Sequence, residues 1–188
     1  GVLIDDLITK GTDEPYRMFT SRAEYRILLR QDNADIRLTR MAQKIGLGSR
    51  ERFERLDKKT KYIDQLTSIL NKKNISPEEI NPTLEKMGES KIARNTRISK
   101  ILSRPKIKFK HIQKCKSLSE FFSKNKPDNE GSEQVEISIK YSGYIEKEQE
   151  SVEKFSRLEN IKIPNNFKYS KIKSISSEGR EKLEKIKP

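Results

Sequence analysis

The stretch SRERFERLDKKTKYIDQLTSILNKK, residues 49–73, carries the apolar pattern that frames this 188-residue chain. Phe53, Leu56, Thr60, Ile63, Leu66 and Leu70 recur every three or four positions. This spacing predicts a long helix with one apolar stripe and mixed charge on its other faces. Ser49 is expected to open the helix, because serine is a favoured N-cap residue.

A second long helix is expected at 133–159, where the apolar residues are Val135, Ile139, Ile145, Val152, Phe155 and Leu158. Ser142 and Gly143 interrupt its pattern. A glycine inside a helix costs up to about 1 kcal/mol relative to alanine and is best tolerated where another backbone packs close. Gly143, flanked by Tyr141 and Tyr144, is therefore predicted to be a crossing point or part of a partner surface.

Shorter elements fill the rest of the chain. Val2 to Ile8 reads as a short strand or extended run without a partner sheet. Capping boxes at Ser76–Glu79 and Ser117–Glu120 predict helix starts, and alternation at 106–110 favours either a strand or the approach to a helix. Further short helices are expected at 36–45, from Ser76 to about Met87, around Ile98–Leu102, at 111–116 and from Ser176 to Lys185.

The predicted fold is mainly α, with two long helices, several short ones and a short extended segment in front. The expected organisation is an extended or loop remnant at 1–20, a basic helical domain at 21–122, a polar linker at 123–132, and a helical segment at 133–188. The chain starts with Gly rather than Met, which indicates a piece of a longer protein.

Positive charge is concentrated in one stretch. The whole chain carries a net charge of +13. Residues 91–126 hold twelve Lys and Arg against one acidic residue, Glu120, a net charge of +11, whereas the charges of residues 1–40 cancel. A charge concentration of this kind is typical of proteins that bind phosphate backbones. The candidates are Lys91, Arg94, Arg97, Lys100, Arg104, Lys106, Lys108, Lys110, Lys114 and Lys116.

Arginines recur in the opening part of the chain. Ser21 and Glu24 fit a capping box, which predicts a helix from Arg22 that would bring Arg22, Arg26 and Arg30 onto one face. The functional interpretation is an anion site that also includes Arg17 and Arg37. The alternative is a solvated or structural face whose arginines pair with Glu14, Glu24, Asp32 or Asp35.

Several kinds of chemistry lack support. The only cysteine, Cys115, permits no disulfide within the chain; its neighbours Lys114 and Lys116 favour a lowered pKa, and the alternative is an ordinary thiol. His111 is the only histidine, and no metal-ligand spacing, catalytic residue or phosphate-cradling glycine loop is visible. No apolar run approaches the roughly 20 residues of a membrane span.

The opening stretch EPYRMFTSRAEYR (14–26), followed by DNAD (32–35), resembles the segment after the flavin-binding domain in the MnmG/GidA family of tRNA wobble-uridine modification enzymes. QVEI (134–137), IKYSGYI (139–145) and residues 176–183 match in the same order. The resemblance implies the C-terminal helical region of an enzyme that binds FAD, uses NADH, forms a homodimer and works in the cytoplasm with the GTPase subunit MnmE. It further implies that this region docks tRNA and partner and stops before the family's terminal helices. Because no glycine fingerprint is present, the chain alone is expected to lack tight FAD binding, and it is not expected to be active by itself.

Two other hypotheses stay open. One is a free-standing basic RNA-binding module, which the charge supports although no known RNA-binding motif is present. The other is a structural helical connector whose charge serves solubility. Salt-dependent tRNA binding distinguishes the connector from the other two.

Overall fold

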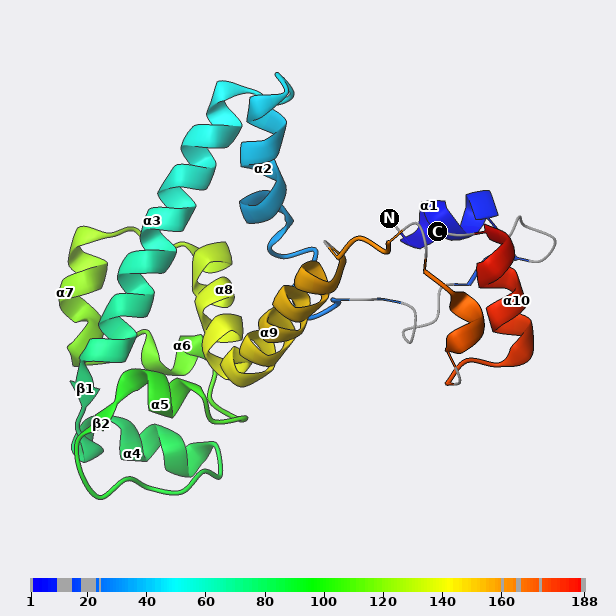
Figure 1. Cartoon of the computed structure of the whole chain (residues 1–188). Coiled ribbons are helices and arrows are strands. Elements are labelled where there is room, and N and C mark those ends of the chain that lie inside the picture. The colour runs from blue at the N-terminus through cyan, green and yellow to red at the C-terminus, as the bar shows by residue number, and fades with distance from the viewer. Residues whose placement is uncertain are drawn as a thin grey trace. The chain divides into compact units, whose positions relative to one another are not determined.

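The computed structural model describes residues 2–9, 15–17, 23, 25–159, 161–164, 167–172 and 174–186, and these are mostly helical (Figure 1). Contacts divide the chain into two units, 1–148 and 149–188. The elements are α1 (Val2–Thr9), α2 (Ala34–Lys44), α3 (Arg50–Lys72), β1 (Asn74–Ile75), α4 (Pro77–Lys86), β2 (Thr96–Arg97), α5 (Ile98–Leu102), α6 (Phe109–Ile112), α7 (Lys116–Lys124), α8 (Asn129–Lys140), α9 (Ser142–Glu159), η2 (Tyr169–Lys171) and α10 (Ser177–Ile186). The predicted mainly α fold is confirmed.

Helix α3 is the frame of the first unit, as its apolar stripe predicts. It packs against α2 and α8 (Figure 1), and Leu66 and Leu70 are fully buried. The core continues into α4, α5, α6 and α7, where Ile80, Ile101 and Leu118 are also fully buried. Aromatic rings join α3 to α7, because the ring centroids of Tyr62 and Phe121 lie 5.4 Å apart.

The only strands among the described residues are β1 and β2, which pair antiparallel over two residues each. The pairing opposes Asn74 to Arg97 and Ile75 to Thr96. Residues 106–110 form no strand; α6 begins at Phe109. Strand β1 follows α3, and β2 directly precedes α5. The short β1–β2 pairing therefore joins the start of α5, in the basic stretch, to the end of α3.

The N-terminal run is helical, so the predicted extended segment is wrong. Residues 2–9 form α1. A lone strand would leave its backbone N–H and C=O groups unpaired, whereas a helix satisfies them internally. In this helix the buried carboxylate of Asp6 accepts a hydrogen bond from the Tyr16 hydroxyl at 2.9 Å.

The capping boxes predicted at Ser76–Glu79 and Ser117–Glu120 are wrong, although α4 and α7 form. Ser76 makes no side-chain cap. Instead the Glu79 carboxylate accepts hydrogen bonds from the backbone N–H (3.0 Å) and the hydroxyl (2.7 Å) of Ser117. The sequence pattern predicts that each of these residues caps its own helix. Glu120 pairs with Lys73 and Lys124, each at 3.1 Å. Tertiary partners have replaced the local ones.

The predicted linker at 123–132 and the single helix at 133–159 are both incorrect. The Asp128 carboxylate accepts from the Gly131 N–H at 3.1 Å and starts α8 four residues before 133. Ser132 is buried, and its Oγ lies 2.8 Å from the Tyr62 hydroxyl. Helix α8 ends at Lys140 with Tyr141 as its C-cap residue, and α9 begins at Ser142, where the sequence pattern is interrupted.

The second unit contains the rest of α9, η2 and α10. Ser176 caps α10, accepting from the Gly179 N–H at 3.2 Å, as predicted. The Ser170 N–H donates to the Glu184 carboxylate at 3.1 Å and so joins η2 to α10. The described residues between α9 and α10 are irregular apart from η2.

Candidate nucleic-acid interface

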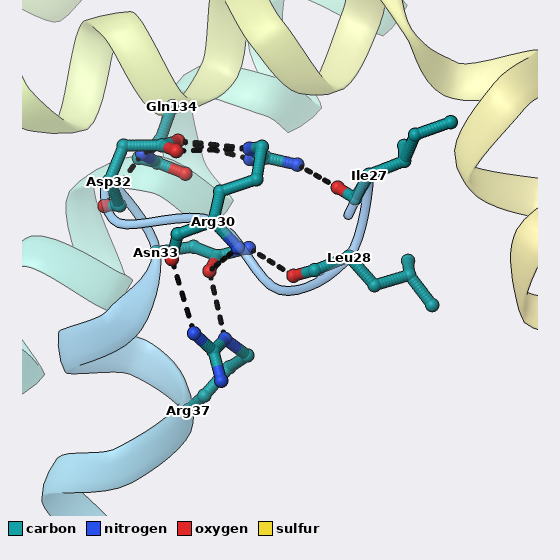
Figure 2. Close-up of polar contacts among 7 residues, drawn as sticks. All are labelled: Ile27, Leu28, Arg30, Asp32, Asn33, Arg37 and Gln134. Atoms are coloured by element: carbon teal, nitrogen blue, oxygen red, sulfur yellow. Dashed lines mark hydrogen bonds and ion pairs between the residues drawn. The ribbon is translucent and has the colours of Figure 1, made fainter. Parts of the chain in front are cut away.

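Residues 25–37 form a tight turn that runs into α2, which we call the arginine turn (Figure 2). Tyr25 has a φ of 54°, in the left-handed region, and its carbonyl accepts from the N–H groups of Leu28 (2.9 Å) and Leu29 (2.8 Å). A left-handed residue does not belong to a regular α-helix. The helix predicted from Arg22 is therefore absent at 25–30, while Ser21, Arg22 and Glu24 lie outside the described residues.

Arg30 is held inside the turn by ionic and backbone contacts (Figure 2). Its Nε and Nη2 donate to the Asp32 carboxylate at 3.0 and 3.1 Å, and its Nη1 donates to the Ile27 carbonyl at 2.7 Å. Two-pronged guanidinium–carboxylate pairs are geometrically specific. Arg30 thus matches the structural alternative rather than the anion-site interpretation.

Arg37 also closes the turn (Figure 2). Its Nε donates to Asn33 Oδ1 at 2.9 Å and its Nη2 to the Arg30 carbonyl at 3.1 Å. Asn33 Nδ2 in turn donates to the Leu28 carbonyl at 2.9 Å. The Arg37 guanidinium therefore donates to groups of the same turn, and it pairs with neither Asp32 nor Asp35, the two described carboxylates named in the alternative.

The turn is fastened to α8 by Gln134, which lies 102 residues further along the chain. The buried Gln134 side chain donates to the Asp32 carbonyl at 2.8 Å and to its carboxylate at 2.5 Å. Partial burial would raise the pKa of Asp32, but the hydrogen bonds from Arg30 and Gln134 and the Arg30 charge outweigh it and lower the pKa.

A second clasp joins the start of α2 to α3 and α8. The Lys59 ammonium, whose side chain is 7% exposed, lies 2.8 Å from Asp35 and 3.5 Å from Glu130. Burial would lower the pKa of Lys59, but the hydrogen bond and charge of Asp35, with the Glu130 charge, raise it. A buried cation is tolerated because two carboxylates compensate it.

Arg17 and Arg26 are the described arginines of this region that remain exposed. Arg17 has a polar interaction of its own. Arg26 has no ion pair or side-chain hydrogen bond within the described part of the chain. The geometry thus separates two turn-building arginines, Arg30 and Arg37, from two at the surface.

The basic stretch contains paired and unpaired cations. Lys91 pairs with Glu85 at 3.2 Å, Arg104 contacts Glu89 at 4.0 Å and the Ser90 carbonyl, and Lys106 donates to the Gly88 carbonyl at 3.2 Å. The remaining predicted backbone-binding residues are exposed, and apart from Lys108 their side chains have no polar partner among the described residues: Arg94, Arg97, Lys100, Lys108, Lys110, Lys114 and Lys116.

The predicted crossing point at Gly143 is wrong within the described chain. A Cβ built on Gly143 would meet no atom within 4 Å, so no backbone approaches it. Tyr141 and Tyr144 are 51% and 64% exposed, with ring centroids 6.3 Å apart. These residues do not pack inside this chain, and a role in partner contact remains a prediction.

Other chemistry finds little support in the described residues. Burial and the Glu79 charge raise the pKa of the Cys115 thiol to about 11, so the neighbouring lysines do not activate it. No three His, Cys, Asp or Glu side chains of the described part gather as metal ligands. Of the helices described, none has the length and apolar character needed to cross a membrane.

Sequence reasoning missed the residues that anchor the arginine turn, Lys59, Gln134 and Glu130. Lys59 carried a signal, because it lies three residues from both Leu56 and Tyr62 and so falls on the buried stripe of α3. Gln134 carried none, because nothing in the local pattern indicates a partner 102 residues away.

Comparisons with known proteins identify the class. The family description "tRNA modifying enzyme MnmG/GidA C-terminal helical domain" matches residues 50–149, and "tRNA modifying enzyme MnmG/GidA C-terminal helical bundle" matches 151–188. The chain is thus of the class of helical regions found in tRNA-modifying enzymes. The boundary between the two matches coincides with that between the two compact units.

The chain belongs to the MnmG/GidA family. It is 51% identical to the tRNA uridine 5-carboxymethylaminomethyl modification enzyme MnmG of Christiangramia forsetii, and 49% to that of Flavobacterium psychrophilum. Both matches cover 100% of this chain and 30% of the relative. Aquifex aeolicus GidA in its form II crystal has a TM-score of 0.63 and 34% identity, covering 100% of this chain and 28% of that one.

Proposed function

We propose that this chain is the helical region of an enzyme that adds a (carboxymethyl)aminomethyl group to C5 of the tRNA wobble uridine, working with the GTPase MnmE. Family membership and the names of the relatives support the proposal. The complete enzyme acts as a cytoplasmic homodimer that uses FAD and NADH. Those cofactors supply the redox chemistry, and the protein orients them and the base.

Within the described residues, no glycine is placed as a dinucleotide-binding loop requires. The described glycines with left-handed φ are Gly46, Gly48 and Gly88, and they lie in the α2–α3 loop and after α4. None follows a strand and opens a helix, as a phosphate-cradling glycine loop does. The glycine loops that bind FAD and NADH are therefore assigned to parts of the enzyme outside the described residues of this chain.

The role of this region is to dock tRNA through the basic stretch. The observation that carries the proposal is the net charge of +11 over residues 91–126, together with its unpaired exposed cations. Such cations replace the counterions condensed on a nucleic acid, so binding weakens as salt rises. The exposed Tyr141–Gly143–Tyr144 surface is assigned to a protein partner, MnmE or the second subunit.

The salt dependence of tRNA binding tests this role in the complete enzyme. With about six phosphates contacted, log affinity falls against log salt with a slope of about −4 to −5. A variant with Gln at positions 94, 97, 100, 110, 114 and 116 should bind with a much shallower slope. Lys58→Gln, Lys61→Gln and Lys72→Gln on exposed faces of α3 are the control. A slope left unchanged by the six substitutions favours the structural connector instead.

The arginine turn has a divided role in the proposal. Arg17 and Arg26 contact tRNA or flavin phosphates, and Arg22 stays a candidate for the same contact. Arg30 and Arg37 instead hold the turn together. Arg26→Lys should lower modification activity at unchanged melting temperature, because Lys lacks the planar fork. Arg30→Lys should lower the melting temperature. Equal melting temperatures for the two variants contradict the division.

A further inference from the structure

An open hollow of ≈ 910 Å³ lies where α3, the β1–β2 pair, α5 and the α8–α9 junction meet. Three cations line it, Arg94, Arg97 and Lys100. The other lining residues are uncharged, and most carry a hydroxyl or amide group. No Asp or Glu belongs to the lining, so the local field of this hollow is positive.

The three cations are not neutralised by their surroundings. All three are exposed, and within the described residues none forms an ion pair. Their sequence neighbours differ, because Lys91 pairs with Glu85 and Arg104 contacts Glu89. The three lining cations thus lack the carboxylate partners that their sequence neighbours have, and their charge is available to an external anion.

Neutral hydrogen-bonding groups complete the lining from outside the basic stretch. Asn71 comes from α3, Ser138 from α8 and Ser142 from the start of α9. Phosphate oxygens accept from hydroxyl and amide groups as well as from guanidinium forks. Asn and Ser can also pair with a ribose 2′-hydroxyl, which both donates and accepts. The lining therefore suits the sugar–phosphate backbone of RNA.

A second hollow beside the basic stretch provides a contrast within the same molecule. Lys114 and Lys116 line it, but so do the carboxylates of Glu78 and Glu79. Those carboxylates repel an incoming phosphate. Net charge along the sequence is similar in the two places, so only the arrangement of side chains distinguishes them.

We propose that the acid-free hollow around Arg94, Arg97 and Lys100 binds a phosphodiester segment of an RNA strand. The proposal rests on the proposed function, that this chain docks tRNA, and locates the dominant contact. Lys110, Lys114 and Lys116 then contribute mainly unspecific attraction.

Two charge-matched triple variants of the complete enzyme test the proposal with an unmodified tRNA transcript. The hollow variant is Arg94→Gln, Arg97→Gln, Lys100→Gln; the control is Lys110→Gln, Lys114→Gln, Lys116→Gln. We expect the hollow variant to lose tenfold or more in affinity and about 2 to 3 units of salt slope. The control should lose less than 1 unit. Melting temperatures should stay near wild type, because the substituted side chains are exposed.

A second pair of variants leaves the cations in place. Ser138→Glu puts a carboxylate into the lining and should weaken tRNA binding. The control is Ser119→Glu, which adds the same charge at an exposed position of α7 away from the lining. Adding inorganic phosphate at constant ionic strength should not change the difference in tRNA affinity between the two triple variants.

Each alternative result has a defined meaning. Equal losses in the two triple variants overturn the hollow but leave tRNA docking by the stretch standing. No loss in either variant, nor in the six-residue variant, overturns the proposed function as well. A difference abolished by inorganic phosphate reassigns the hollow to free phosphate.

Discussion

Asp32 is the residue on which the arginine turn depends. Its carboxylate binds Arg30, and both its carboxylate and its carbonyl bind Gln134 (Figure 2). The Arg30 and Asp32 side chains are 21% and 31% exposed, so water screens this pair less than an open surface pair. Removing the carboxylate would leave the Arg30 guanidinium without its ionic partner.

We expect Asp32→Asn to lower the free energy of unfolding at pH 7 by about 1 to 3 kcal/mol, the cost of losing hydrogen bonds to a charged group. The folded-state pKa of Asp32 is lowered, so its stabilisation is complete above about pH 4 and is lost as pH falls through that lowered pKa. The gap between wild type and variant should therefore shrink in urea denaturation at low pH. Asp57→Asn, at an exposed residue 3.7 Å from Arg40, is the control. A gap of equal size at pH 7 and pH 2 contradicts this assignment.

Helix α8 contributes residues to the arginine turn, to the contact with α3 and to the acid-free hollow. Its first turn carries Gly131 and Ser132 against Tyr62, its buried face carries Gln134, and its last turns carry Ser138. The close approach at Gly131 is specific, because an added Cβ would lie 2.7 Å from Tyr62 Cδ1 and 3.0 Å from Asp128 Oδ2. A shift of α8 would therefore disturb both the contact of Gln134 with the arginine turn and the lining of the acid-free hollow.

Two glycine substitutions should act in opposite directions. Gly131→Ala should destabilise by about 1 to 3 kcal/mol, because it overpacks the contact with Tyr62. Gly143→Ala has open space and should stabilise α9 by up to about 1 kcal/mol, the helix preference of Ala over Gly. Urea denaturation of both variants is the measurement. Destabilisation by Gly143→Ala would show that Gly143 packs against something after all.

At the scale of the whole molecule, nearly all of the buried apolar residues lie in the first unit. The main cluster runs from Tyr62 to Val135, and among the described residues of the second unit the buried apolar residue is Tyr169. With hydrophobic residues at 32% and charged residues at 37%, the chain has few apolar side chains from which to build a core. Stability therefore rests on a small set of core side chains in α3 to α8.

Leu66→Ala is expected to lower the free energy of unfolding of the chain by about 2 to 5 kcal/mol, because a fully buried leucine leaves a cavity. Phe155→Ala, at a side chain that is 54% exposed on α9, should change it by less than about 0.5 kcal/mol. Chemical denaturation followed by circular dichroism provides the comparison. Similar effects of the two substitutions would contradict a core confined to the first unit.

The sequence alone determined what depends on local pattern. Apolar spacing predicts α3 to within a residue, Gly88 marks the end of α4, Ser176 caps α10, and Ser142 lies at the break between α8 and α9. The EPYRMFTSRAEYR stretch is specific enough to indicate the family. These features hold because helix periodicity and caps involve residues within a few positions of one another.

Only the tertiary structure decided which partners the polar residues take. Glu79 bonds Ser117 rather than its own helix cap, Arg30 bonds Asp32, and Gln134 reaches Asp32 across 102 residues. The acid-free hollow likewise combines Arg97 of β2 with Ser138 of α8, which lie 41 positions apart in the sequence. The free energy of a polar side chain depends on whichever donors, acceptors and charges the fold brings beside it, and local spacing carries no record of them.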